Sequence, residues 1–247
     1  MQSALRSAAV AGVASVAAIL GSSAQASITL GNGQTVLLSE VFAEQDRTVY
    51  IGDKEFKFES WASSVWGASE ITLSGFISQN ENEYGLKNVG FDLFGSFGDG
   101  SPGDGTIHEA NLQYTVAVRP EYYDRGIRLC DAKLVFNGSA SGSGSFARVD
   151  ETIFDLDANS LLGQLSVFDS VGPPPNSRLS DARDFCEGGL PGFRAFEVNK
   201  DLKFFAHEAN DSSTASFVRQ EFSQVPAPGA IALLGLAGAV GSRRRRN

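Results

Sequence analysis

Apolar and polar side chains alternate over many short stretches between residues 27 and 225. In residues 112–118, for example, Leu112, Tyr114 and Val116 alternate with polar neighbours. A period of two is typical of a strand with one face buried and one in solvent. Strands are predicted on this basis within 48–52, 55–59, 71–77, 84–94, 112–118, 132–136, 146–154, 164–168, 194–205 and 214–222.

Turn-forming residues punctuate these stretches. Glycine, asparagine, aspartate and proline gather at 52–53, 80–82, 98–105, 137–138 and 172–176, and these residue types favour the backbone conformations of turns. Helical patterns are short, near 38–43 and 180–186. About ten short strands separated by turns indicate an all-β fold, a single antiparallel β-sandwich or jelly-roll-like domain over residues 27–224.

The first 26 residues have the three parts of a secretory signal. Arg6 carries the positive charge, residues 8–20 are uncharged and largely apolar, and Ala24 and Ala26 are the small residues that a signal peptidase requires. Cleavage is predicted before Ser27. The alternative is an uncleaved N-terminal anchor, for which the apolar run is short.

Residues 225–247 form the opposite terminal signal. Pro226 and Pro228 are followed by an apolar stretch at 229–241 and by four basic residues, Arg243, Arg244, Arg245 and Arg246. As a helix this stretch would cover about 20 Å, against about 30 Å of membrane hydrocarbon. The arginines would remain on the cytoplasmic side by the positive-inside preference. The segment therefore predicts a short, transiently used transmembrane helix with a stop-transfer signal.

This order of prolines, apolar helix and arginines resembles the PEP-CTERM sorting signal of bacterial envelope proteins. Pro226 matches the first proline of that motif, Pro228 the second, and residues 243–246 the basic stop. Ala227 stands where the family most often has glutamate, as in a VPAPGA variant of the same group. The resemblance implies processing by an exosortase-type membrane protease and a place in the cell envelope or at the extracellular surface. The alternative is a plain tail anchor.

A looser likeness covers most of the region between the two signals. Gly52–Phe56, the extended Tyr84–Leu86, Phe136–Gly144 and Phe222–Pro226 are similar to short motifs of uncharacterised PEP-CTERM ectodomains. This likeness implies one domain and no particular activity.

Charge narrows the range of partners. The chain has 29 acidic and 20 basic residues, and five of the basic ones lie in the two terminal signals, which leaves a net charge of −14 on residues 27–225. A body this acidic repels phosphate backbones and anionic lipid surfaces. Nucleic acid is therefore excluded as a partner, and contact with a membrane is expected only through the C-terminal helix.

Cys130 and Cys186 are the two cysteines of the chain. In an exported protein an even count favours a disulfide. Closing the loop between them would remove chain entropy worth about 4 kcal/mol. We expect this disulfide.

Candidate chemistry is sparse. His108 and His207 are the two histidines, and neither lies near a nucleophile-elbow motif, so no catalytic residue is assigned and a hydrolase is the third hypothesis. Asp99 and Asp104 flank a glycine-rich loop whose oxygens are of the kind that calcium takes. Turn chemistry explains that loop equally well. No cofactor and no metal site is therefore predicted, with calcium at Asp99 and Asp104 as the alternative.

Two functions remain for the body. The first is a non-enzymatic structural role in the cell envelope or extracellular matrix, and the alternative is a carbohydrate-binding, lectin-like module with extracellular polysaccharide as its partner, calcium-assisted or not. Trp61 and Trp66, with Tyr84, Tyr122 and Tyr123, are candidates for an aromatic face that stacks on sugar rings. A binding module should expose Trp61 or Trp66 in a concave patch, whereas a structural protein should bury both.

Overall fold

The computed structural model describes residues 27–172, 174–187 and 191–227. The predicted signal peptide, with Ala24 and Ala26, lies outside the described residues. So does the sorting segment from Pro228 through Arg246. Within the described ranges, no helix is long and apolar enough to cross a membrane.

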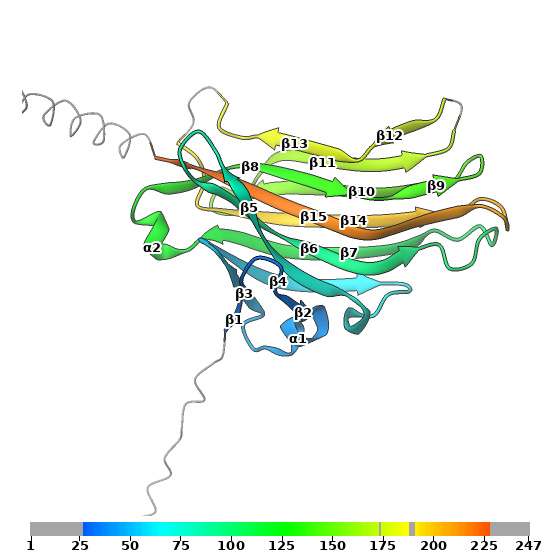
Figure 1. The fold of residues 1–247 in the computed structure, drawn as a ribbon, viewed down its shortest axis with the longest axis horizontal. Coiled ribbons are helices and arrows are strands. Elements are labelled where there is room, and N and C mark those ends of the chain that lie inside the picture. The colour runs from blue at the N-terminus through cyan, green and yellow to red at the C-terminus, as the bar shows by residue number, and fades with distance from the viewer. Residues whose placement is uncertain (1–26, 173, 188–190, 228–247) are drawn as a thin grey trace, which may run out of the picture.

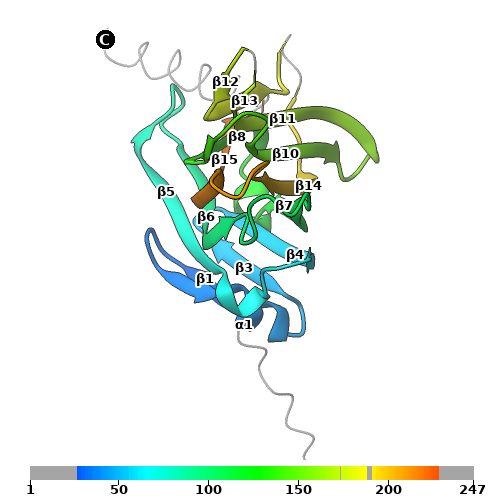
Figure 2. The same cartoon turned by 90° about the vertical axis from the view of Figure 1, so that its right-hand side faces the viewer.

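Two β-sheets pack face to face (Figures 1 and 2). Sheet A has the strand order β1 (Ile28–Leu30), β3 (Thr48–Ile51), β4 (Lys54–Ser63), β7 (His108–Val118), β14 (Ala195–Phe205), β10 (Phe146–Asp155), β11 (Ser160–Ser170) and β12 (Asn176–Arg178). Sheet B has the order β13 (Ser180–Asp184), β8 (Ile127–Phe136), β15 (Ser212–Pro226), β6 (Lys87–Gly98), β5 (Thr72–Glu81) and β2 (Thr35–Leu37), and β9 (Ser139–Ser141) pairs with β15. The predicted all-β sandwich is confirmed. One pairing, β1 with β3, is parallel.

The alternation of side chains builds the core. In β7 every second residue from His108 to Val118 is buried between the sheets, and the residues between them face solvent or lie at the surface. Aromatic rings fill the centre: Phe91 of sheet B lies 5.4 Å from Phe56 and 5.2 Å from Tyr114 of sheet A, both in edge-to-face geometry. Such contacts add specific geometry to the burial of apolar area.

One edge of the sandwich is closed by a segment that passes from sheet A to sheet B. β12 pairs with β11 and the following β13 pairs with β8, and the backbone N–H of Ser166 in β11 donates to Asp181 of β13 at 2.9 Å. The helix expected at 180–186 is therefore wrong. The backbone groups of β13 find partners on β8, and this tertiary pairing outweighs a short local pattern.

The disulfide lies at this same edge. Cys130 of β8 and Cys186, two residues after β13, are bonded to each other. The bond holds the chain-crossing segment against sheet B.

Two helices complete the described chain. α1 (Leu38–Ala43) occupies the range expected from the sequence and buries Leu38 and Val41. α2 (Pro120–Tyr123) follows β7 and has no apolar periodicity to reveal it, because it is a single turn started by a proline at its first position. A 3₁₀ turn, η1 (Ala68–Glu70), precedes β5.

Two boundaries differ from the sequence expectation. Tyr84 and Gly85 lie in the turn between β5 and β6, with a positive φ of 72° at Gly85, and do not begin an extended strand. Pro226, expected in the C-terminal sorting segment, is the last residue of β15 and pairs with Ile127. There β15 has lost its second neighbour, β6, so that the missing N–H of proline leaves no ladder position empty.

Candidate binding site

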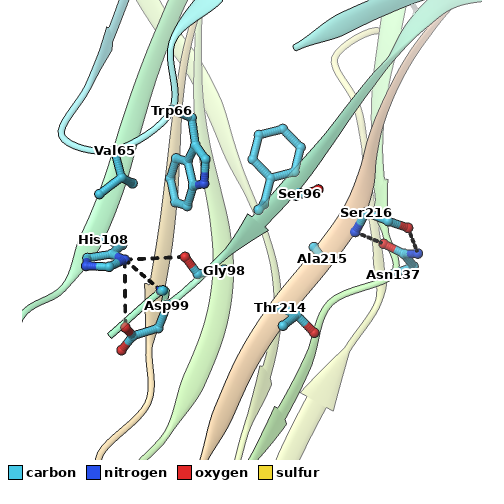
Figure 3. A pocket seen from close by; sticks show the side chains of 12 residues that line it. Val65, Trp66, Ser96, Gly98, Asp99, His108, Asn137, Thr214, Ala215 and Ser216 are labelled. Atoms are coloured by element: carbon cyan, nitrogen blue, oxygen red, sulfur yellow. Dashed lines mark hydrogen bonds and ion pairs between the residues drawn. The ribbon is translucent and has the colours of Figure 1, made fainter. Parts of the chain in front are cut away.

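A groove opens at the end of the sandwich opposite α2, beside the connection between β6 and β7 (Figure 3). Its volume is about 610 Å³. We call it the Trp66 groove. The residues lining it come from the β4–β5 connection, β6, the β6–β7 connection, the start of β7, the residue after β8, and β15: Val65, Trp66, Ser96, Phe97, Gly98, Asp99, Gly100, His108, Asn137, Thr214, Ala215 and Ser216.

Trp66 forms the apolar wall. Its ring packs edge-to-face on Phe97 at 5.7 Å and on Phe204 at 5.5 Å, which leaves 9% of the residue exposed. The carbonyl oxygen of Trp66 accepts a hydrogen bond from the Trp61 indole at 2.9 Å. Each tryptophan thus helps to hold the β4–β5 connection in place, and the ring edge that Trp66 shows to the groove is rigid.

His108 and Asp99 form the polar wall. The Gly100 N–H donates to Nδ1 of His108 at 3.1 Å, and the carbonyl oxygen of Gly98 lies 3.4 Å from the same nitrogen. Asp99 Oδ1 lies 3.7 Å from Nδ1. The same carboxylate accepts hydrogen bonds from the backbone N–H groups of Ser101 at 2.9 Å and Ala206 at 2.7 Å. Asp99 thus links the β6–β7 connection to the loop that follows β14.

Asn137 shapes the opposite wall. Its Oδ1 accepts from the backbone N–H groups of Ser216 and Phe217 at 3.0 Å each, and its Nδ2 donates to Ser216 Oγ at 2.7 Å. These bonds give the backbone N–H groups of β15 a partner at the point where the pairing of β15 with β6 shifts register, between Ala215 and Phe217. A bulge of this kind bends a strand and redirects its side chains, and here it turns Ser216 toward the groove.

The outer face of sheet B continues from the groove. Phe94, 41% exposed, lies two residues along β6 from Ser96 and contacts the ring of Phe217 at 6.3 Å. In the next row Arg219 forms a two-bond pair with Asp92 (2.7 and 2.9 Å) and lies 4.0 Å above the ring of Phe76. We call these five residues the sheet B strip.

The sequence analysis named none of the strip. Phe94 and Phe217 are aromatic residues at positions where the alternation along their strands predicts polar ones. This departure from the pattern is the sequence feature that could have identified the strip. The partner of Arg219 lies 127 positions away in the chain, and nothing local reveals it.

The aromatic face for which the sequence offered candidates does not form. Trp61 and Trp66 are at the groove end, whereas Tyr122 and Tyr123 belong to α2 at the other end of β7 and Tyr84 to the β5–β6 turn. Trp66 is buried, as expected of a structural role, whereas Trp61 is half-buried. Trp66 nevertheless contributes to the groove, and the exposed aromatic residues beside it are phenylalanines.

The remaining candidates are placed apart. His207 is exposed just after β14. Asp104 is exposed, and its carboxylate accepts from the Thr106 N–H at 2.7 Å, a local turn bond. Within the part of the chain that the structure describes, the cluster of Cys130, Asp184 and Cys186 is the one group of three metal-ligating side chains, and its two sulfur atoms are joined to each other.

Comparison with known proteins gives structural neighbours. No family model and no curated protein matches the sequence. Among solved structures, the mannan-recognising carbohydrate-binding module TmCBM27 is 10% identical, with a TM-score of 0.28 over 76% of this chain and 95% of that one. Carbohydrate-binding modules of the β-sandwich superfamily are 9% identical, with a TM-score of 0.27 over 80% and 63%. A DUF4465 family protein from Bacteroides caccae is 9% identical, with a TM-score of 0.24 over 66% and 86%. Likeness of this size does not establish a shared function.

Proposed function

We propose that this protein is exported to the cell envelope or extracellular surface and that its β-sandwich binds a neutral polysaccharide in the Trp66 groove and along the sheet B strip. The observation that carries the proposal is the continuity of the two features. A rigid indole edge, hydroxyl and imidazole groups, and the exposed ring of Phe94 follow one another along the same end of the sandwich.

Sugars suit such a surface. A pyranose ring has apolar C–H faces that pack on aromatic rings and hydroxyl groups that form hydrogen bonds at its edge. The net charge of −14 on residues 27–225 disfavours an anionic polymer. A neutral glycan meets no such repulsion.

Binding without catalysis is part of the proposal. A hydrolase of the serine type needs a hydroxyl held by the histidine base. Nδ1 of His108 faces the Gly98–Gly100 backbone, and among the described residues no serine or threonine hydroxyl is bonded to the ring. The groove thus offers a surface for recognition.

The binding test is an array of neutral and anionic glycans probed with the purified protein, with and without calcium. Phe94→Ala should weaken binding of the captured neutral glycan about tenfold, or about 1.4 kcal/mol. Ser96→Trp, which fills the groove from an exposed position, should abolish binding. The control is Leu161→Ala, which truncates an exposed apolar side chain on sheet A and should leave the affinity unchanged.

Two results would contradict the proposal. If no neutral glycan binds, the structural role expected from the sequence remains. If anionic glycans bind only in the presence of calcium, and Asp99→Ala and Asp104→Ala remove that binding, cation bridging replaces the groove as the mode of attachment.

The export part of the proposal has its own test. In the native host the mature chain should begin at Ser27 and should lack the residues beyond the prolines, as signal peptidase and an exosortase-type protease would leave it. Intact-mass spectrometry measures both ends at once. Recovery of Arg243 to Arg246 on most surface molecules would show a retained anchor instead.

A further inference from the structure

Strand β15 brings two glutamines into the sandwich interior, and each meets a buried lysine of sheet A. Gln220 Oε1 accepts from Nζ of Lys200 at 2.8 Å, and Gln224 Oε1 accepts from Nζ of Lys54 at 2.6 Å. Neither lysine has any exposed surface. Lysine is among the residues least often buried in this way, so that both pairs call for an explanation.

The Lys200 pair includes a fully buried carboxyl group. Lys200 of β14 is the direct cross-strand partner of Glu151 on β10, and its Nζ contacts Glu151 Oε2. Glu151 is 1% exposed and Gln220 is fully buried. An amine, a carboxamide and a carboxyl group thus meet in one water-excluded place.

This cluster is incompletely satisfied. Oε1 of Glu151, Nε2 of Gln220 and the hydroxyl of the neighbouring Tyr114 have no hydrogen-bond partner among the described residues. Leaving a buried polar group without a hydrogen-bond partner is unfavourable.

Burial also changes the protonation of the cluster. Desolvation lowers the pKa of Lys200, with Glu151 opposing the change. Desolvation raises the pKa of Glu151, while the charge of Lys200 acts in the other direction. Both shifts favour the neutral forms, a free amine and a carboxylic acid. A neutral lysine is a nucleophile.

We propose that Lys200 and Gln220 form an intramolecular isopeptide bond, with Glu151 as the proton carrier. The three side chains already lie together, and the amide of Gln220 presents its carbonyl oxygen to Nζ of Lys200 at 2.8 Å.

The reaction is a transamidation that balances without an oxidant or a co-reactant. Nζ of Lys200 attacks Cδ of Gln220, and the acid proton of Glu151 goes to the amide group. The Cδ–Nε2 bond then breaks, Nε2 leaves as ammonia, and the proton lost by Nζ returns to Glu151. The product is a secondary amide between the two side chains, with Glu151 unchanged.

The second pair has a similar composition and a different setting. Nε2 of Gln224 donates to the backbone carbonyl of Lys87 at 2.7 Å, so that its amide nitrogen is held. The carboxyl beside Lys54 is Asp53, at 3.0 Å from Nζ, and 11% of its side chain is exposed. We expect this pair to remain a hydrogen-bonded pair, and it serves as the internal control.

The bond can be measured directly on the purified, folded protein. After reduction of the Cys130–Cys186 disulfide, the intact mass should be lower than that of the mature sequence by one ammonia molecule. In a tryptic digest, the peptides that contain Lys200 and Gln220 should appear as one branched species. Localisation matters because cyclisation at Asn137-Gly138 would also release ammonia. Recovery of Lys200 and Gln220 in separate linear peptides would overturn the proposal.

Variants assign the roles. Glu151→Gln, of similar shape, should restore the unlinked mass, and a branched peptide in that variant would refute the role of Glu151. Lys54→Met should keep the branched peptide and the ammonia loss. If Glu151→Gln does not fold, the peptide map of the parent protein still decides whether the bond exists.

Discussion

The pair between Arg219 and Asp92 allows a quantitative test of how the outer face of sheet B is held. The change is Arg219→Ala. Asp92 is 5% exposed, and two hydrogen bonds at 2.7 and 2.9 Å from the guanidinium compensate its charge. Without Arg219 the carboxylate remains buried and uncompensated.

The size of the effect follows from burial. Opposite charges about 4 Å apart attract by about 4 kcal/mol at an effective dielectric constant of about 20. Breaking one side of a buried pair costs about 3–5 kcal/mol. Since 32% of the Arg219 side chain is exposed, solvent screens part of the attraction, and we expect a loss of about 3 kcal/mol in the free energy of unfolding. This expected loss includes the loss of the contact between Arg219 and the ring of Phe76.

Urea unfolding of the parent, the single variants and the Asp92→Ala/Arg219→Ala double variant measures this pair as a cycle. The double variant should regain part of the loss, because it removes the uncompensated charge. The control is Arg148→Ala: Arg148 and Asp150 form a pair with side chains 50% and 32% exposed, and its loss should cost less than about 1 kcal/mol. Equal costs for Arg219→Ala and Arg148→Ala would refute the reasoning from burial.

Three further outcomes follow from other parts of the sandwich. Gly90→Ala would place a Cβ 1.8 Å from the carbonyl oxygen of the adjacent β15 strand, so that it should destabilise the fold by more than about 3 kcal/mol in urea unfolding, whereas Gly172→Ala, whose nearest neighbour is at 4.0 Å, should be neutral. Burial lowers the pKa of Lys54, so that between this lowered value and 10.5 the unfolded chain binds more protons than the folded one. The free energy of unfolding of the parent should therefore rise with pH relative to that of Lys54→Met. Parallel pH curves for the two proteins would contradict this. Replacing Cys130 and Cys186, which are 56 positions apart, by alanine should lower the free energy of unfolding by about 4 kcal/mol, and a loss below about 1 kcal/mol would show that the unfolded chain is already compact there.

The strands could be predicted from sequence to the extent that they alternate. β7 and β14 show this clearly, since nearly every second residue is buried. The 180–186 segment misled the prediction because its strand partner is β8, about 50 residues earlier, and an edge strand that is exposed on most of its length carries no alternation. Long-range pairing of this kind has no local signature.

The candidate site was harder to predict for the same reason. The sequence analysis named Trp66 as a candidate for sugar stacking and Asp99 as a candidate for calcium. The groove, however, depends on the register shift in β15 and on the Asn137 side chain, which bonds to the backbone at that shift. Lys200 and Gln220 appear in the sequence as ordinary polar residues. Only the pairing of the two sheets brings their side chains into contact.

The path of β15 determines how the domain would respond to a pulling force. Among the strands of the described residues it is the last and the longest, from Ser212 to Pro226, and it lies between β6 and β8 over much of its length. Inter-strand hydrogen bonds are perpendicular to the strands, so tension applied at Pro226 along the strand would load both ladders in shear. Many bonds would then have to break together, whereas a strand peeled from an edge gives way one bond at a time. A domain pulled through β15 would therefore resist unfolding more strongly than one pulled through an edge strand.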